Sequence, residues 1–189
     1  MVNIGVSGHR ELGNDQAAAN AVDIVLKKIK ESYRDSQIRV ISPLAEGADR
    51  LVASRAIEIF SAQLIVPLPF GMSEYMTDFK SASSKTEFED LMKLAVQVVQ
   101  IPEEKTREAG YLAAGRYMLD HCDVLIALWD GRSARGIGGT GQIVAEARNQ
   151  GKPMAWIQIE RQESVPQSEP KRDVDQILIH YERFSGINR

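Results

Sequence analysis

Cysteine is almost absent from this sequence, as are long apolar runs and any excess of basic residues. The single cysteine, Cys122, cannot form an internal disulfide, which favours a reducing compartment. No stretch approaches the roughly 20 apolar residues that cross a bilayer, and the first residues do not resemble a secretion signal. The net charge of -3 argues against a broad basic surface. We therefore expect a cytoplasmic protein whose partners include neither a membrane nor duplex nucleic acid.

Histidine is also scarce, which limits the chemistry that the chain can perform. The three histidines, His9, His121 and His180, are scattered, and no spacing suits a metal ion. Ser7 precedes a glycine but lacks the GxSxG pattern, and Cys122 has no evident activating neighbour. We therefore expect no metal, no cofactor and no covalent nucleophile.

The composition that remains is that of an ordinary folded domain, with 189 residues, 43% hydrophobic and 26% charged. Short apolar segments alternate with longer amphipathic ones, which is typical of parallel strands joined by crossover helices. We predict an α/β fold with a Rossmann-like, doubly wound, mainly parallel six-stranded sheet flanked by helices. The strands are predicted at Val2–Val6, Ile38–Ile41, Leu64–Val66, Ala95–Ile101, Val124–Trp129 and Met154–Ile159.

The predicted plan has one domain at 1–159, a polar linker at 160–172 and a C-terminal helix within 173–189 that packs on the same domain. Residues 124–129 contain no polar side chain, so we place that strand in mid-sheet. The connection from Pro67 to about Lys85 is unusually long and is a candidate lid. The other helices are predicted near 14–33, 51–59, 86–94, 109–120 and 139–150.

The strongest local signal is a glycine-rich helix start after the fifth strand. Ligands of open parallel sheets lie beyond the carboxyl ends of the strands. Glycines let backbone N–H groups approach a phosphate, and a helix N-terminus presents unpaired N–H groups with a partial positive charge. A flexible turn capped by threonine is the alternative. The predicted contacts are Gly138, Gly139, Thr140 and Gly141, with Asp130 and Gly131 before them.

The first strand ends in Ser7-Gly8-His9-Arg10, which also resembles a nucleotide-binding turn. It matches neither the GxGxxG fingerprint nor a Walker A loop, so NAD binding and ATP hydrolysis lose support. Arg10 is suited to bind a phosphate through two hydrogen bonds, and His9 to donate to the same anion. Alternatively, both are solvated turn residues.

The second strand leads to Glu46-Gly47-Ala48-Asp49-Arg50 at a helix start. Glu46, Gly47 and Asp49 are candidate ligand contacts. Carboxylates in a first turn also suit the helix dipole, so capping alone is the alternative for Glu46 and Asp49. Arg50 opposes the dipole, and we expect it to pair with Glu46, Asp49 or a ligand. Glu46 is also suited to accept a hydrogen bond from a ribose hydroxyl.

Two further segments hold candidate ligand contacts. Gly115 lies inside a predicted helix, where glycine costs about 1 kcal/mol relative to alanine, which suggests a close approach of another backbone or a ligand. Arg116 follows it and is a candidate contact. Tyr75, Asp78 and Phe79 on the long connection are candidates to close over a base, with a packed surface loop as the alternative.

Together, residues 7–10, 42–50 and 122–131 with Gly138-Gly139-Thr140 resemble the SLOG superfamily, which includes the DprA (Smf) proteins and the LOG phosphoribohydrolases. The resemblance spans roughly residues 2–159 and implies a Rossmann-like domain that binds a nucleotide or a nucleotide-derived ligand. Enzymatic members, including relatives of the nucleoside deoxyribosyltransferases, cleave or exchange N-glycosidic bonds. Other prokaryotic members, some in antiphage systems, bind signals such as cyclic ADP-ribose variants.

This chain departs from the PGGxGTxxE pattern of the LOG enzymes. It has no proline before the glycines and has Ala145 where the glutamate falls, while Glu146 lies one residue later, about 100° around the helix. Gln142 stands where closer relatives often carry an acid, and its amide can hydrogen-bond a ribose but cannot act as a base. This favours a sensor of a nucleotide, such as an ADP-ribose or cyclic nucleotide species, in a stress or antiphage pathway.

Two points stay open at this stage. An N-glycosidic hydrolase or transferase, with Glu46 or Glu146 as the catalytic carboxylate, is the alternative function. We also predict a homo-oligomer, for which the apolar face of the first helix is a candidate surface.

Overall fold

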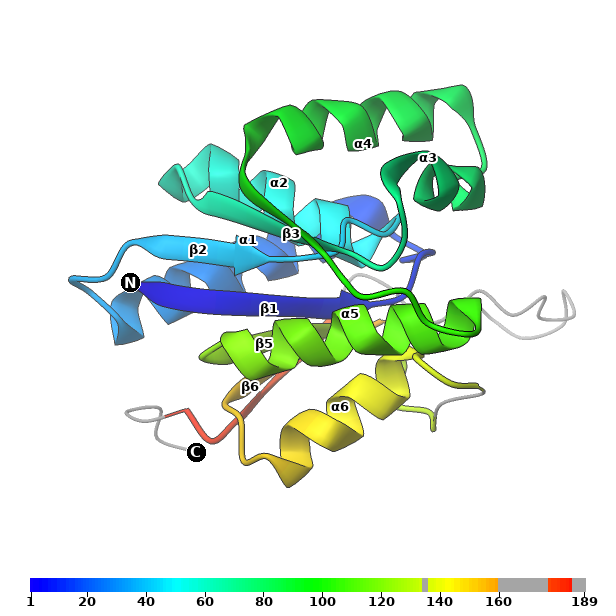
Figure 1. Cartoon of the computed structure of the whole chain (residues 1–189). Coiled ribbons are helices and arrows are strands. Elements are labelled where there is room, and N and C mark those ends of the chain that lie inside the picture. Colours follow the sequence, from blue (N-terminus) through cyan, green and yellow to red (C-terminus); the bar gives the residue numbers. More distant parts are fainter. Residues whose placement is uncertain (134–135, 160–176, 185–189) are drawn as a thin grey trace, which may run out of the picture.

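The computed structural model describes residues 1–133, 136–159 and 177–184, and these form a doubly wound α/β fold (Figure 1). The described residues contain one seven-stranded sheet with the order β4-β3-β2-β1-β5-β6-β7. All neighbouring strands are parallel except β6 and β7. The strands are β1 (Val2–Gly8), β2 (Ile38–Ile41), β3 (Gln63–Leu68), β4 (Ala95–Gln100), β5 (Val124–Trp129), β6 (Met154–Gln158) and β7 (Leu178–Glu182). The predicted fold class is confirmed, with seven strands in place of six.

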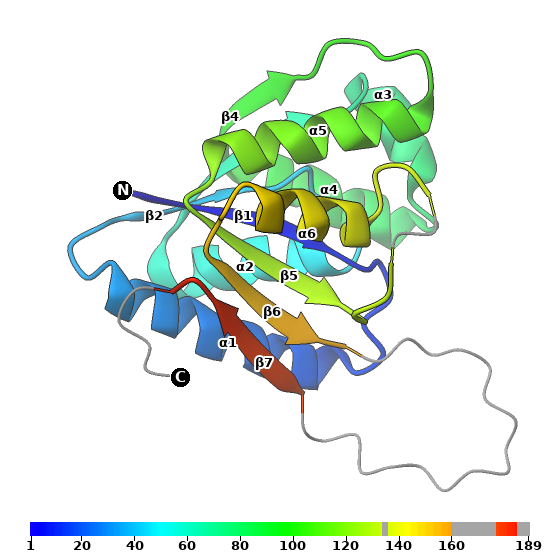
Figure 2. The same cartoon turned by 90° about the horizontal axis from the view of Figure 1, so that it is seen from below.

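Helices cover both faces of this sheet (Figure 2). One buried cluster joins α1 and α2 to the sheet, and a second joins α5 and α6 to the opposite face. The helices are α1 (Asp15–Ser32), α2 (Ala48–Phe60), α3 (Met72–Tyr75), the 3-10 helix η1 (Met76–Asp78), α4 (Ala82–Leu94), α5 (Arg107–His121) and α6 (Thr140–Asn149). Strand β5 is buried at every residue and lies between β1 and β6, which confirms its predicted mid-sheet position.

The predicted C-terminal helix is wrong for the residues that the structure describes, because residues 178–182 form strand β7. This strand runs antiparallel to β6 and so pairs with an edge that β6 would otherwise expose. His180 stacks on Trp156, and Arg148 of α6 pairs with Glu182 at 2.7 Å. The predicted linker at 160–172 lies outside the described residues.

The long connection after β3 packs against the domain, so it matches the predicted packed loop and not the predicted lid. Pro67 lies inside β3, beyond the predicted end of that strand. The connection then forms α3 and η1, and it buries Tyr75 and Phe79 in an aromatic cluster with Phe70 and Phe88. It therefore builds a fixed wall of the molecule.

The apolar face of α1 is also used inside the domain. Its six buried residues face the sheet and α2, so this face is not available as the predicted dimer surface. They are Ala18, Ala21, Val22, Val25, Leu26 and Ile29. Among the described residues, no helix combines the length and the apolar character needed to cross a membrane.

Candidate ligand-binding cleft

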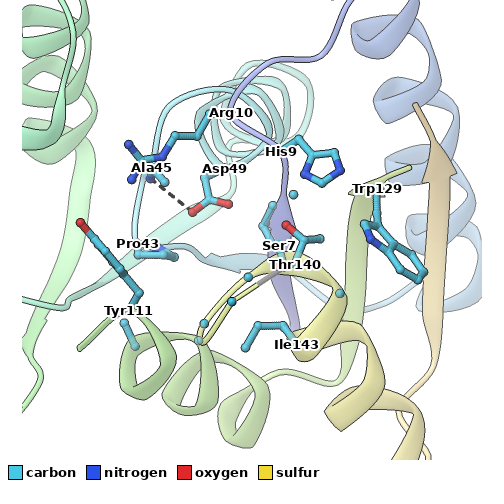
Figure 3. A pocket seen from close by; sticks show the side chains of 18 of the residues that line it. Ser7, His9, Arg10, Pro43, Ala45, Asp49, Tyr111, Trp129, Thr140 and Ile143 are labelled. Carbon is cyan, nitrogen blue, oxygen red and sulfur yellow. Dashed lines mark hydrogen bonds between the residues drawn. The ribbon is translucent and has the colours of Figure 1, made fainter. Parts of the chain in front are cut away.

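A cleft of about 540 Å³ lies at the carboxyl ends of β1 and β5, beside the N-terminus of α6 (Figure 3). These two strands are neighbours, and the helices that follow them cover opposite faces of the sheet. Such a switch point is where open α/β sheets hold their ligands. The predicted residues that line the cleft are Gly8, His9, Arg10, Asp49, Tyr75, Asp130, Gly138, Gly139, Thr140 and Gly141.

The N-terminus of α6 faces the cleft with open hydrogen-bond donors. Gly139 is the N-cap, and no side chain caps the helix. Gly138 has a φ of 78°, a left-handed conformation that favours glycine. Within residues 1–133, 136–159 and 177–184, the N–H groups of Gly139, Thr140 and Gly141 find no acceptor. This end of the cleft is therefore suited to an anion.

A chain of side-chain hydrogen bonds holds the glycine turn in place. The N–H of Gly138 donates to Gln142 Oε1 at 2.9 Å, and Gln142 Nε2 donates to Glu146 at 3.1 Å. Arg116 binds the same carboxylate through Nε at 2.9 Å and Nη2 at 2.8 Å. Hydrogen bonds from Arg116 lower the pKa of Glu146. The side chains of this hydrogen-bonded chain bind one another and do not line the cleft. The predicted ligand contacts of Arg116 and Gln142, and the predicted catalytic role of Glu146, are therefore not supported.

Arg50 does not reach the cleft either, which corrects its prediction as a ligand contact. Its side chain is only 2% exposed. Nε donates to the carbonyl of Leu44 at 3.0 Å, and Nη1 donates to Ser84 and to Glu87 Oε2 at 2.9 Å. The guanidinium also lies 4.3 Å from the ring centre of Phe79. Arg50 therefore fixes α4 and the aromatic cluster to α2.

Glu46 and Gly47 lie beside the cleft and contact the chain segments around it. Glu46 accepts from the N–H of Lys80 and the hydroxyl of Ser84, and it lines a neighbouring shallow hollow. Partial burial raises the pKa of Glu46, but these two hydrogen bonds and the charges of Arg50 and Arg10 together lower it. Gly47 has a φ of 79°, and a Cβ there would lie 2.3 Å from the carbonyl oxygen of Arg10. Neither residue lines the cleft, so their predicted ligand contacts are not supported.

Asp49 is the carboxylate of this motif that does line the cleft. It is 5% exposed, and its carboxyl group points toward the cleft (Figure 3). Oδ2 accepts from the N–H of Ala45 at 3.2 Å. Burial raises the pKa of Asp49 to about 7, although Arg10, Arg50 and the hydrogen bonds act in the opposite direction. A group that changes charge near neutral pH thus lies in the cleft wall.

The first turn supplies a cation and an imidazole to the cleft. Arg10 is exposed, and in the described part of the chain it forms neither an ion pair nor a hydrogen bond. His9 Nε2 lies 3.2 Å from Asp130 Oδ1 and 3.4 Å from the backbone nitrogen of Asp130, so the tautomer decides which contact is a hydrogen bond. Gly131 turns beneath Trp156 and is outside the lining.

Tyr111 is a cleft residue that was not predicted from the sequence. Its ring faces Pro43 across the cleft (Figure 3). The hydroxyl donates to Asp78, which Arg107 also binds at 2.6 Å. The rings of Tyr111 and Phe70 form a T-shaped pair with centroids 5.2 Å apart. The position of Tyr111 one helical turn before Gly115 was the available signal. Gly115 also lines the cleft, and a Cβ there would lie 2.6 Å from the Ile143 side chain.

Comparisons with known proteins add little to this geometry. Neither a protein-family model nor a curated protein sequence matches the chain. The structural genomics target TM1055 aligns with 82% of this chain over 72% of its own length, at 14% identity and a TM-score of 0.48. Uridylate kinase from Archaeoglobus fulgidus aligns with 84% of this chain over 91% of its own, at 13% identity and a TM-score of 0.26. Likenesses this distant do not identify a ligand.

Proposed function

We propose that this chain is a SLOG-type domain that binds a nucleotide or a nucleotide-derived signal by its phosphate. The observation that carries the proposal is the convergence of two kinds of unused donor on one cleft. The N–H groups at the start of α6 and the guanidinium of Arg10 both line it and have no acceptor among the described residues.

The anion end of the cleft is organised before a ligand arrives. A helix N-terminus carries about half a positive charge, and its N–H groups are already directed at the position of an anion. Arg10 adds a planar guanidinium that is suited to two parallel hydrogen bonds with a phosphate. The hydroxyl of Thr140 is a further donor at the same position (Figure 3).

The rest of the cleft suits an uncharged, partly aromatic group. Tyr75, Tyr111 and Pro43 provide an apolar wall, while Asp49 and Asp130 provide acceptors for hydroxyl or N–H donors. A ligand that combines a phosphate with a sugar and a flat ring satisfies all of these surfaces. A cleft of about 540 Å³ is also within the size range of small-molecule sites.

Recognition without glycosidic cleavage fits the carboxylates best. Glu46 and Glu146, the two candidates for catalysis, lie outside the cleft lining and are held by other protein groups. Their lowered pKa values make both poor proton donors at neutral pH. A cytoplasmic location, a role in a prokaryotic stress or antiphage pathway and a homo-oligomeric state complete the proposal, and sedimentation tests the last.

A thermal-shift screen tests the proposal directly. AMP, ADP-ribose, cyclic ADP-ribose and cyclic dinucleotides are compared with the corresponding nucleosides. We expect phosphorylated ligands to raise the melting temperature and nucleosides to leave it unchanged. Chromatography of each hit should detect no free base. Catalytic release of base would overturn the assignment as a binding domain.

The same screen gains specificity from a pair of arginine variants. Arg10→Ala should weaken binding of a hit by at least about tenfold, or about 1.4 kcal/mol. Arg34→Ala removes an exposed arginine beyond the end of α1 and should leave affinity unchanged. Equal affinities in both variants would place the anion elsewhere.

A further inference from the structure

Asp49 is a buried carboxylic acid in the wall of a cleft that offers donors to an anion at the N-terminus of α6 and at Arg10. We propose that Asp49 takes up a proton when an anion binds in the cleft, so that ligand affinity depends on pH. This inference rests on the proposed function, since it concerns the same cleft and the same anion.

Arg10 is the cation that stabilises the Asp49 carboxylate and is also placed to bind an anion in the cleft. Arg50, the adjacent residue in the sequence, is bound to Leu44, Ser84 and Glu87. Arg10 extends along the cleft toward Ala45 and Asp49 but forms no ion pair in the described chain (Figure 3). Its charge nevertheless lowers the pKa of Asp49 from a distance. A bound anion competes with Asp49 for this guanidinium.

Binding changes the electrostatic surroundings of Asp49 in two ways, and both have the same sign. The anion pairs with the guanidinium of Arg10, so this cation stabilises the Asp49 carboxylate less. The anion also brings its own negative charge into the cleft that Asp49 faces. Each change disfavours the carboxylate form and raises the pKa of Asp49. Because burial already holds this pKa at about 7, the additional rise falls in the neutral range. Affinity should therefore fall as the pH rises above 7.

Other charged and titratable groups face the cleft from each neighbouring element. Tyr75 of α3 stays neutral because burial raises its pKa well above its ordinary value. Tyr111 of α5 has its pKa raised by burial and by its bond to Asp78. Lys80 and Glu11 pair at 2.8 Å. His9 Nε2 lies 3.2 Å from Asp130 Oδ1, and Arg132 also lines the cleft.

The experiment must therefore observe Asp49 itself. Sulfate is a suitable probe because it occupies phosphate sites and does not titrate near neutral pH. Carboxyl carbon signals of the full chain, labelled at aspartate, are followed by NMR across pH 5 to 9 in sodium sulfate and in sodium chloride of equal ionic strength. We expect sulfate to raise the pKa of Asp49. Asp23, which pairs with Arg55, is the internal control and should not respond.

Sulfate affinity supplies the reciprocal measurement. In the wild type it should fall by up to roughly tenfold for each pH unit just above the pKa of free Asp49, the limit for uptake of one proton. In Asp49→Asn, which keeps an oxygen acceptor for the N–H of Ala45, we expect this dependence to disappear. The wild-type NMR titration tests the inference even where the variant does not fold.

The outcomes separate this inference from the proposed function. If sulfate shifts the amide signals of Gly139, Thr140 and Gly141 while the pKa of Asp49 stays constant, the proton coupling is wrong and the anion site stands. If sulfate shifts none of these amides, the anion site itself is wrong, and the coupling falls with it.

Discussion

Two helices begin at the cleft, α2 and α6, and their first N–H groups have different partners. Each has a glycine N-cap, Gly47 or Gly139, and neither has a side-chain cap. At α2 the N–H of Ala48 donates to the carbonyl of His9 at 3.1 Å, so the protein satisfies its own helix end. At α6 the corresponding N–H of Thr140 faces the cleft, with no acceptor in the described residues. A glycine-capped helix start becomes a candidate anion site only where no chain segment packs over it.

The two arginines near these helix ends differ in the same way. Arg50 is buried in a set of protein hydrogen bonds, whereas Arg10 is exposed and lines the cleft. Arg10 lies just after β1, and Arg50 lies in the first turn of α2. Partners and burial, rather than residue type, thus separate the structural cation from the candidate ligand cation.

The largest expected change in unfolding free energy comes from replacing Arg50 by alanine, with the Arg10→Ala variant for comparison. Arg50→Ala removes the donor that the carbonyl groups of Leu44 and Ser84 share, so we expect the free energy of unfolding to fall by about 2–3 kcal/mol. Arg10→Ala should change it by no more than about 0.5 kcal/mol. Urea unfolding measures both. Similar losses in the two variants would erase the distinction between the helix starts.

The glycine turn offers a sharper test with a matched control. Gly138→Ala forces a side chain into φ of 78°, with its Cβ 3.0 Å from the carbonyl oxygen of Glu108. We expect a loss of about 1–2 kcal/mol in unfolding free energy. Gly136→Ala meets nothing within 4 Å and should be neutral within about 0.5 kcal/mol. Thermal unfolding compares the two, and a neutral Gly138→Ala would show that the turn is not fixed.

A smaller effect, dependent on pH, is expected at the start of α2. The pKa of Asp49 rises from 3.8 to about 7 on folding, so the unfolded chain loses this proton first as the pH rises. Asp49 therefore lowers wild-type stability between these pH values. Asp49→Asn lacks this pH dependence. Its unfolding free energy relative to that of the wild type should therefore rise by at least about 1 kcal/mol from pH 4 to pH 8. A difference between the two proteins that stays constant with pH would contradict the raised pKa.

The smallest expected effect concerns the support of the α6 turn. Gln142→Glu keeps an acceptor for the N–H of Gly138 but places a second carboxylate beside Glu146. Like charges at this helical spacing destabilise by about 0.2–0.5 kcal/mol. In a Glu146→Gln background the penalty should vanish, which a double-mutant cycle in urea would measure. An unchanged penalty would mean that the two side chains do not interact.

The sequence was informative about the fold where its signals were local. The apolar run at 124–129 predicted the mid-sheet strand, and the glycines before Thr140 predicted the helix start that faces the cleft. Strand β7 was missed although Ile177, Ile179 and Tyr181 alternate and pack on the core. The paired residues of β6 lie 20 to 28 positions earlier, and only that pairing makes so short a segment a strand.

The charged residues of the cleft were harder to assign from sequence. Arg50 pairs with Glu87, 37 residues later, and Arg116 with Glu146, 30 residues later. Such pairs are invisible until the fold brings them together. The same limit applies to Asp49, because its raised pKa arises from burial by segments that are distant in the chain.

The hydrogen bonds from Gly138 through Gln142 and Glu146 to Arg116 have a kinetic consequence. They hold the α6 turn in place, so the proposed anion would meet donors that need little rearrangement. Association should then be limited by diffusion and by long-range attraction, and its rate should fall as salt screens that attraction. Loss of the Arg116 contact would instead shorten the lifetime of the complex.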